Sequence, residues 1–315
     1  MKLNLLQGVQ CYLATRRRLG FALVKEGVAL QGLVRYAKHI GHRGALTAQL
    51  AIQWAQHPQP ADRLYWASRL DIVRRFASFW IAYDPRTEIP PRGLFGPTFR
   101  RRPVHVYTPQ EIGRLLAAAT DQNPKCPFRG QTFRTLIGLL ACTGMRIGEV
   151  LGLVDQDLDW TTGVLTIRHA KYGHARLVPL SHCTLKALRD YQQARHQALG
   201  RRLTPTLFVN PHGRPLGCIA VAVAFRRLCR HLGWTQTPVP RLHDLRHTFA
   251  VRTLLQWYEQ GEPIDPKLWI LSTYLGHRHP ANTYWYLTAV PELMRWCQQR
   301  LASAQPWASG GVAHD

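Results

Sequence analysis

The chain has 315 residues, which is enough for two domains because a single hydrophobic core rarely grows beyond about 250 to 300 residues. Its 41 Lys and Arg residues against 18 Asp and Glu give a formal net charge of +23. Self-repulsion of this size opposes compaction unless a polyanion balances it. The composition therefore favours nucleic acid as the partner, ahead of a membrane surface or a merely basic soluble protein.

The basic excess is shared by both halves, since residues 1–103 carry a net charge of +12 and residues 104–315 a net charge of +11. Both halves are thus expected to contact the polyanion.

The seven cysteines are odd in number and scattered without a C-x-x-C pair, which favours reduced thiols in the cytoplasm. We find no secretory signal and no apolar run approaching the roughly 18 to 20 residues of a membrane-spanning helix. We expect a cytoplasmic, nucleoid-associated protein with no membrane partner.

Apolar residues recur at three- and four-residue spacing through the first part of the chain, at 28–40, 45–55 and 61–84. This period predicts amphipathic helices, and we assign residues 1–84 to a helical DNA-binding domain. In the last helix, Arg63, Arg69, Arg74 and Arg75 are expected on the outer face.

Residues 85–104 contain five prolines and the run Arg100, Arg101 and Arg102. Proline removes a backbone donor and fixes φ, so we expect a stiff, extended linker. The three arginines are predicted to contact the DNA backbone.

The second domain is expected over 105–302, followed by a flexible tail at 303–315. Thr108 and Glu111 have the spacing of a capping box, a buried helix follows at 131–144, and Gly144 is a natural helix stop. Alternating residues at 163–170 and 175–180 predict a hairpin, after which the chain is mostly helical. The predicted class is therefore mainly α with a small antiparallel sheet. We find no internal repeat, no GxxxxGK[ST] and no GxGxxG, so no cofactor is expected.

Four segments combine basic, imidazole and phenol side chains: TGMRIGEVLGL (143–153), Lys171 in the hairpin, LHDLRHTFA (242–250) and LGHRHPANTYWYL (275–287). In order and spacing they resemble the catalytic segments of the tyrosine recombinase (phage integrase) family. The resemblance covers about 105–300, and more weakly the helical first domain, which is similar to that family's core-binding domain.

Arg146 and Arg246 are the matching arginines. A phosphodiester transition state gathers negative charge on its non-bridging oxygens, and a guanidinium offers two hydrogen bonds and a permanent charge there. Glu149 follows Arg146 by three residues, where a carboxylate either holds the guanidinium in position or is favoured by the helix dipole.

The resemblance implies that Lys171 is the general acid for the departing 5′ oxygen, that His243 accepts the tyrosine proton, and that His277 donates to the phosphate. Arg176 either contacts DNA or braces the hairpin. The pairs His243 with His247 and His277 with His279 raise the possibility of zinc. The neighbouring arginines argue against it, so we expect no metal.

Tyr286 lies nine residues after His277, which matches the family's spacing to the nucleophile. Tyr284 would point elsewhere if this segment is helical. The resemblance implies site-specific cleavage and rejoining of double-stranded DNA through a covalent 3′-phosphotyrosine, independent of metal and ATP, for a mobile element. It also implies a homotetramer on DNA, with accessory DNA-bending or directionality factors. The alternatives are relaxation of DNA in the manner of a type IB topoisomerase, or a catalytically inactive DNA-binding relative.

Overall fold

The computed structural model describes residues 4–57, 59–100, 103–123, 125–168, 175–200, 204–236, 239–277, 279, 281–284, 286, 294–295 and 298–299. The chain divides into two compact units, Met1–Arg102 and Pro103–Asp315. Each unit encloses its own apolar core.

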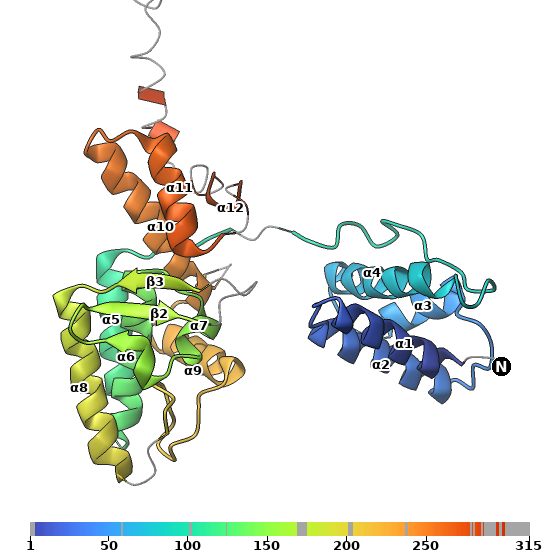
Figure 1. Cartoon of the computed structure of the whole chain (residues 1–315), viewed down its shortest axis with the longest axis horizontal. Helices are drawn as coiled ribbons and strands as arrows, with labels where there is room; N and C mark the ends of the chain where they lie inside the picture. The colour runs from blue at the N-terminus through green and yellow to red at the C-terminus, as the bar shows by residue number, and fades with distance from the viewer. Residues whose placement is uncertain are drawn as a thin grey trace, which may run out of the picture. The chain divides into compact units, whose positions relative to one another are not determined.

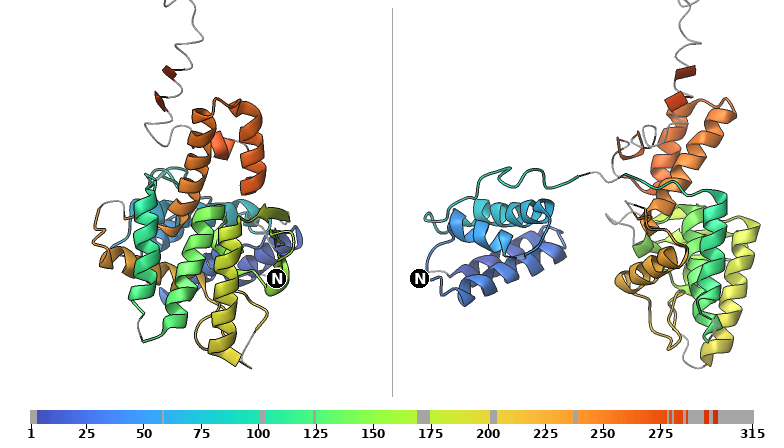
Figure 2. Two further views of the ribbon diagram at one scale, coloured as in Figure 1. Left: turned by 90° about the vertical axis from the view of Figure 1, so that its left-hand side faces the viewer. Right: turned by 180° about the vertical axis from the view of Figure 1, so that it is seen from behind.

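The first unit is a bundle of α1 (Leu5–Arg18), α2 (Val24–His39), α3 (Ala48–Gln56) and α4 (Arg63–Trp80) (Figures 1 and 2). Leu30, Leu33, Phe76 and Trp80 are among the side chains buried between the helices. The helices predicted at 28–40, 45–55 and 61–84 are thus present, and in the last of them Leu70 and Phe76 are buried while Leu64, Trp66 and Ile72, also expected to point inward, are half-buried. The fourth helix stops at Trp80, four residues before the predicted end.

Contrary to the expectation, Arg69 of α4 is not available on the outer face. The guanidinium carbon of Arg69 lies 3.7 Å from the ring centroid of Trp54, and its Nη2 donates to the Trp54 carbonyl at 2.7 Å. A cation over an indole face is stabilised by the ring quadrupole, which holds Arg69 against α3.

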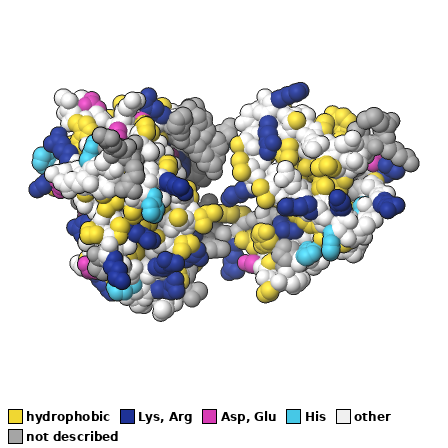
Figure 3. All heavy atoms as spheres, turned by 90° about the horizontal axis from the view of Figure 1, so that it is seen from below, with side chains coloured by type: hydrophobic (Ala, Val, Ile, Leu, Met, Phe, Trp, Pro, Cys, Tyr) yellow, Lys and Arg dark blue, Asp and Glu magenta, His cyan; other side chains and the backbone are white. Residues whose placement is uncertain are grey.

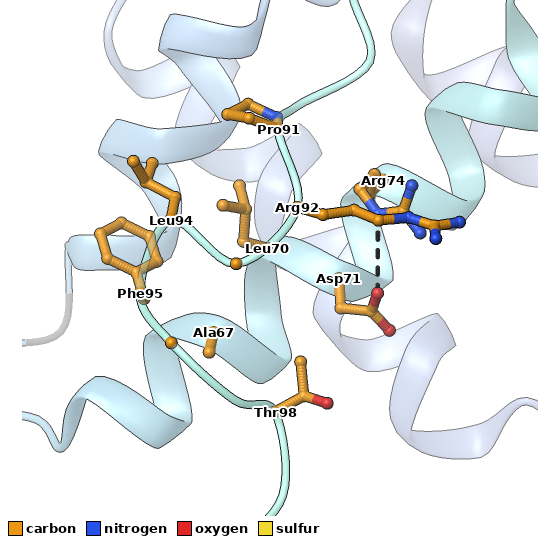
Figure 4. A pocket seen from close by; sticks show the side chains of 11 residues that line it. Ala67, Leu70, Asp71, Arg74, Pro91, Arg92, Leu94, Phe95 and Thr98 are labelled. Carbon is orange, nitrogen blue, oxygen red and sulfur yellow. Dashed lines mark ion pairs between the residues drawn. The ribbon is translucent and has the colours of Figure 1, made fainter.

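The proline-rich segment differs from the extended linker that we expected. Phe95 packs edge-on against Trp66 of α4 with ring centroids 5.8 Å apart, and the Glu88 amide donates to the Leu46 carbonyl. Figure 4 shows this loop curling over α4, with the Arg74–Asp71 ion pair beside it. Loop and helix together line a cavity of about 280 Å³. Proline prevents a helix here but does not prevent aromatic packing, so residues 85–98 belong to the first unit.

The second unit is built around α6 (Pro127–Thr143), which contacts α5 (Pro109–Asp121), α8 (His182–Leu199) and α10 (Leu242–Glu259) (Figure 1). The other helices described in this unit are α7 (Ile147–Leu151), the 3₁₀ helix η1 (Asp155–Asp157), α9 (Cys218–His231), α11 (Ile264–Leu275) and α12 (Ala281–Tyr284). The predicted capping box of Thr108 and Glu111 is present at the start of α5.

A three-stranded antiparallel sheet lies beside α7 in the order β1 (Leu158–Asp159), β2 (Val164–Ile167) and β3 (Arg176–Pro179). The second and third strands form the predicted hairpin, with Leu165 opposite Val178. Both side chains are fully buried, so this pair fixes which face of the hairpin meets the core. The fold is mainly helical with a small antiparallel sheet, as the sequence predicts.

Candidate active site

The site begins where α6 ends. Gly144 adopts a left-handed conformation with φ +61°, and a Cβ there would lie 2.6 Å from the ring of Phe249. Only glycine fits both the backbone angle and the close approach. The chain therefore reverses at Gly144 and places Arg146 at the N-terminus of α7.

Arg146 is held by three hydrogen bonds. Its Nη1 donates to Glu149 Oε1 at 2.9 Å, its Nη2 donates to the Gly276 carbonyl at 2.8 Å, and its backbone amide donates to Glu149 Oε2 at 2.8 Å. Since Gly276 is the residue that ends α11, this side chain connects two of the four segments found in the sequence.

Glu149 is buried and binds a second guanidinium. Arg176 Nη1 and Nη2 donate to the two Glu149 oxygens at 2.9 and 2.7 Å. Burial alone would raise the pKa of Glu149, but the hydrogen bonds from Arg176 and Arg146 outweigh it and lower the pKa to about 2. The carboxylate is therefore ionised and fixes both arginines. The Arg176 side chain is only 10% exposed, which favours bracing of the hairpin over a DNA contact.

Arg246 of α10 is 2% exposed. Its Nη1 donates to the Gly144 carbonyl at 2.9 Å and its Nη2 to the Leu275 carbonyl at 2.6 Å, so the ends of α6 and α11 are tied to α10. Burial and the positive charge of Arg146 lower the pKa of Arg246 to about 10. It remains a cation at neutral pH.

Three imidazoles line the same region. His243 and His247 are one turn apart on α10, with ring centroids 4.6 Å apart, and His277 Nδ1 is hydrogen-bonded to Thr283 Oγ1 at 2.8 Å. His243 exposes part of its ring, yet the protein around it desolvates the imidazole and, with the charge of Arg246, lowers its pKa. Burial and the charges of Arg246 and Arg146 lower the pKa of His277 to about 4. Both rings are therefore largely neutral at pH 7.

Tyr286 is 2% exposed, and its ring is close to those of both His247 and His277, with centroid distances of 5.5 and 6.0 Å. Burial raises the pKa of the Tyr286 phenol, while the charge of Arg246 and a hydrogen bond from it act in the opposite direction. Tyr284, by contrast, is 45% exposed. The structure thus brings Arg146, His243, Arg246, His277 and Tyr286 together, with Glu149 and Arg176 behind them.

Some predicted residues cannot be placed. Lys171, Arg101 and Arg102 lie outside the described residues, and Arg100 is exposed at the end of the first unit. Sequence reasoning considered His247 only as a partner of His243 in a zinc site. Within the described part of the chain, no group of three or more His, Cys, Asp or Glu could hold a metal ion. The i, i+4 spacing to His243 was the signal that could have placed His247 in the site.

The same described part contains no helix long and apolar enough to cross a membrane. On the face drawn in Figure 3, basic side chains are spread over both units and few acidic ones lie among them.

Comparison with known proteins gives consistent results. The sequence model of the phage integrase family matches residues 105–292. A Sinorhizobium fredii protein named as an integrase/recombinase, y4rB, is 41% identical over 304 residues, covering 94% of this chain and 96% of the relative. The tyrosine recombinase XerD of Staphylococcus saprophyticus is 28% identical over 231 residues, covering 73% of each chain.

Solved structures share the fold at low identity. The Tn1549 transposon integrase, in complex with a circular intermediate DNA, aligns with a TM-score of 0.65 and 18% identity over 93% of this chain and 99% of that one. A lambda integrase dimer bound to a core site aligns with a TM-score of 0.60 and 15% identity over 90% and 77% of the two chains. Taken with the assembled arginines, imidazoles and tyrosine, the family match shows that this chain belongs to the phage integrase family of tyrosine recombinases.

Proposed function

We propose that the protein is a site-specific recombinase that cleaves and rejoins double-stranded DNA through a covalent 3′-phosphotyrosine, in the service of a mobile element. The observation that carries the proposal is the burial of Tyr286 beside His277 and near Arg246, whose charge opposes the rise in the pKa of the phenol, while Arg146 supplies a second fixed cation. Two guanidinium groups beside one buried phenol suit attack on a phosphodiester.

In the proposed cleavage step, the Tyr286 oxygen attacks the scissile phosphorus while its proton passes to His243. The bond from phosphorus to the 5′ oxygen breaks, and Lys171 protonates the departing oxygen to leave a free 5′ hydroxyl. Arg146, Arg246 and His277 donate hydrogen bonds to the non-bridging oxygens. Attack by a 5′ hydroxyl of another strand reverses these steps and releases the tyrosine, so ATP and metal have no part in the reaction.

The remaining parts of the proposal concern assembly. Exchange between two duplexes requires four cleavages, which implies a homotetramer on DNA. We assign DNA binding to residues 1–84, catalysis to residues 105–302, and contacts with the DNA backbone to the arginines at 100–102. We further propose that accessory DNA-bending or directionality factors take part and that the protein is cytoplasmic and nucleoid-associated. The Tn1549 integrase structure contains a circular intermediate DNA, the recombinase XerH is bound to a palindromic difH substrate, and lambda integrase is bound to a core site. These complexes support DNA as the partner here.

The experiment that tests the proposal compares Tyr286→Phe with Tyr284→Phe on a labelled suicide substrate. Covalent attachment should disappear in Tyr286→Phe and persist in Tyr284→Phe, with the adduct mapped to the peptide that contains Tyr286. An adduct retained by Tyr286→Phe and lost by Tyr284→Phe would contradict the assignment. Relaxation of a supercoiled plasmid without any defined site would instead indicate a type IB topoisomerase, and wild-type protein that binds DNA but never forms an adduct would indicate an inactive relative.

A further inference from the structure

His247 packs against both of the side chains that the proposed reaction connects. Its ring meets that of His243 edge-on, with centroids 4.6 Å apart and an interplanar angle of 83°. The centroid of Tyr286 is 5.5 Å from that of His247, at an interplanar angle of 60°. These separations are within the range of direct aromatic packing, so the His247 imidazole contacts both the His243 and the Tyr286 rings.

The backbone that carries His247 is fixed on both sides of it. Arg246 and Thr248 are each 2% exposed. Arg246 donates to the Gly144 and Leu275 carbonyls, whereas the Thr248 hydroxyl donates to the Asp244 carbonyl and accepts from the Tyr107 amide. A ring whose backbone is held in this way can fix the position of the side chains that it touches.

The surroundings of His247 disfavour the protonated, positively charged form of its imidazole. Burial, followed by the nearby His243, Arg241 and Arg246, lowers the pKa of His247 to about 3. The ring is therefore neutral at working pH, and it adds no charge to a site that already contains Arg146 and Arg246. Its ring instead packs directly against the His243 and Tyr286 rings.

We propose that His247 is a positioning residue, whose flat ring packs against both His243 and Tyr286 and holds the two side chains in place. The inference rests on the proposed function, because it assumes that His243 accepts the Tyr286 proton. Without the ring, the phenol has room to move away from both His243 and the scissile phosphorus. A misplacement of about 1 Å can cost on the order of 100-fold in rate.

The test uses His247→Ala, which removes the ring, and His247→Phe, which keeps a flat ring but cannot exchange a proton. His196→Ala is the matched control, since His196 is exposed on α8. Adduct formation on the suicide substrate should fall on the order of 100-fold in His247→Ala. It should stay within about tenfold of wild type in His247→Phe, with noncovalent DNA affinity similar in all variants. If His247→Phe is as slow as His247→Ala while DNA binding persists, His247 exchanges protons and the positioning role is wrong.

A second readout does not depend on activity. Tyrosines are acetylated with N-acetylimidazole and mapped by mass spectrometry, using Tyr284, which is 45% exposed, as the internal reference. Tyr286 should become several-fold more reactive relative to Tyr284 in His247→Ala and stay protected in His247→Phe and His196→Ala. Equal protection in wild type and His247→Ala overturns the proposal.

These two readouts separate the inference from the proposed function. If wild-type protein forms no adduct, the proposed function fails, and the acetylation pattern still decides whether His247 holds Tyr286. Thermal melting accompanies each variant. Should His247→Ala unfold, His247→Leu replaces it, because leucine keeps the apolar volume without the flat ring, and it should show the same direction of change in both readouts.

Discussion

Arg176 donates both of its terminal amines to the two carboxylate oxygens of Glu149, at 2.9 and 2.7 Å. The two residues are 27 positions apart in the sequence, one on β3 and the other on α7. Their ion pair therefore attaches the hairpin that carries Lys171 to the helix that begins at Arg146. Forked guanidinium–carboxylate pairs fix geometry as well as charge.

Replacing Glu149 with glutamine should change the dependence of stability on pH. The folded pKa of Glu149, about 2, lies below its ordinary value of about 4.3. A depressed carboxylate pKa adds stability above pH 4.3, and that stability is lost as the pH falls toward 2. At pH 7 we expect Glu149→Gln to lower the free energy of unfolding by about 3 kcal/mol.

Denaturant unfolding from pH 7 to pH 2 measures this effect. The difference between wild type and Glu149→Gln should shrink as the pH falls through that range. Asp190→Asn, an exposed carboxylate change on α8, is the control and should change stability little. A constant difference at every pH would show that the ion pair does not depend on the Glu149 charge.

Gly144→Ala should destabilise the second unit and slow cleavage. The added methyl group would lie 2.6 Å from the Phe249 ring in a residue with φ +61°, and such strain costs about 2 kcal/mol. Because the Gly144 carbonyl accepts a hydrogen bond from Arg246, any backbone shift also moves a proposed catalytic arginine. Thermal melting and the suicide-substrate assay measure the two effects.

The control for this change is Gly113→Ala. Gly113 lies within α5, and a Cβ there would contact nothing within 4 Å. Alanine in such a position should stabilise the helix by about 0.5 to 1 kcal/mol. Equal melting temperatures for the two variants would show that the left-handed turn tolerates a side chain.

Adduct formation should keep more than about half of its rate as the pH is lowered from 8 to 6.5. The reason is that His243 must be neutral to accept the Tyr286 proton. Desolvation and the charge of Arg246 lower its pKa below the ordinary value, so that protonation occurs only at more acidic pH. Single-turnover rates across this range test the expectation, and a midpoint at or above pH 6.5 would argue against His243 as the acceptor in this environment.

Cleavage should survive chelation by EDTA. Among the described residues, the buried carboxylates of the site are Glu149 and Asp244, and both oxygens of each are bound by arginines. A two-metal mechanism needs free carboxylates to hold its ions. The assay compares adduct yield with and without EDTA, and a loss that magnesium or zinc restores would refute the proposed mechanism.

DNA affinity should depend steeply on salt because of the net charge of +23. Each neutralised phosphate contributes about −0.9 to the slope of log K against log salt concentration. Titration by fluorescence anisotropy at 50 to 200 mM salt should show a loss of orders of magnitude if six or more phosphates are contacted. An affinity that does not change with salt would mean that the excess Lys and Arg side chains do not contact the DNA phosphates.

Several features of the protein follow from local sequence alone. The helices of the first unit and the hairpin around Leu165 and Val178 obey short-range periods of apolar residues. Thr108 and Gly144 mark helix ends because capping and a left-handed turn depend on one or a few neighbouring residues. The order of the four segments was likewise sufficient to indicate the family. The domain limits and the roles of the site residues remain predictions.

Other features were decided only by tertiary packing. Nothing in the sequence shows that Arg176 is paired with Glu149, that Phe95 folds the proline-rich segment onto Trp66, or that His247 packs against both His243 and Tyr286. Such contacts join residues that are far apart in the chain, and they form only where several helices bury their apolar faces together. The sequence by itself determined which groups are present and where the helices end, whereas the close-packed interior determined which of those groups meet.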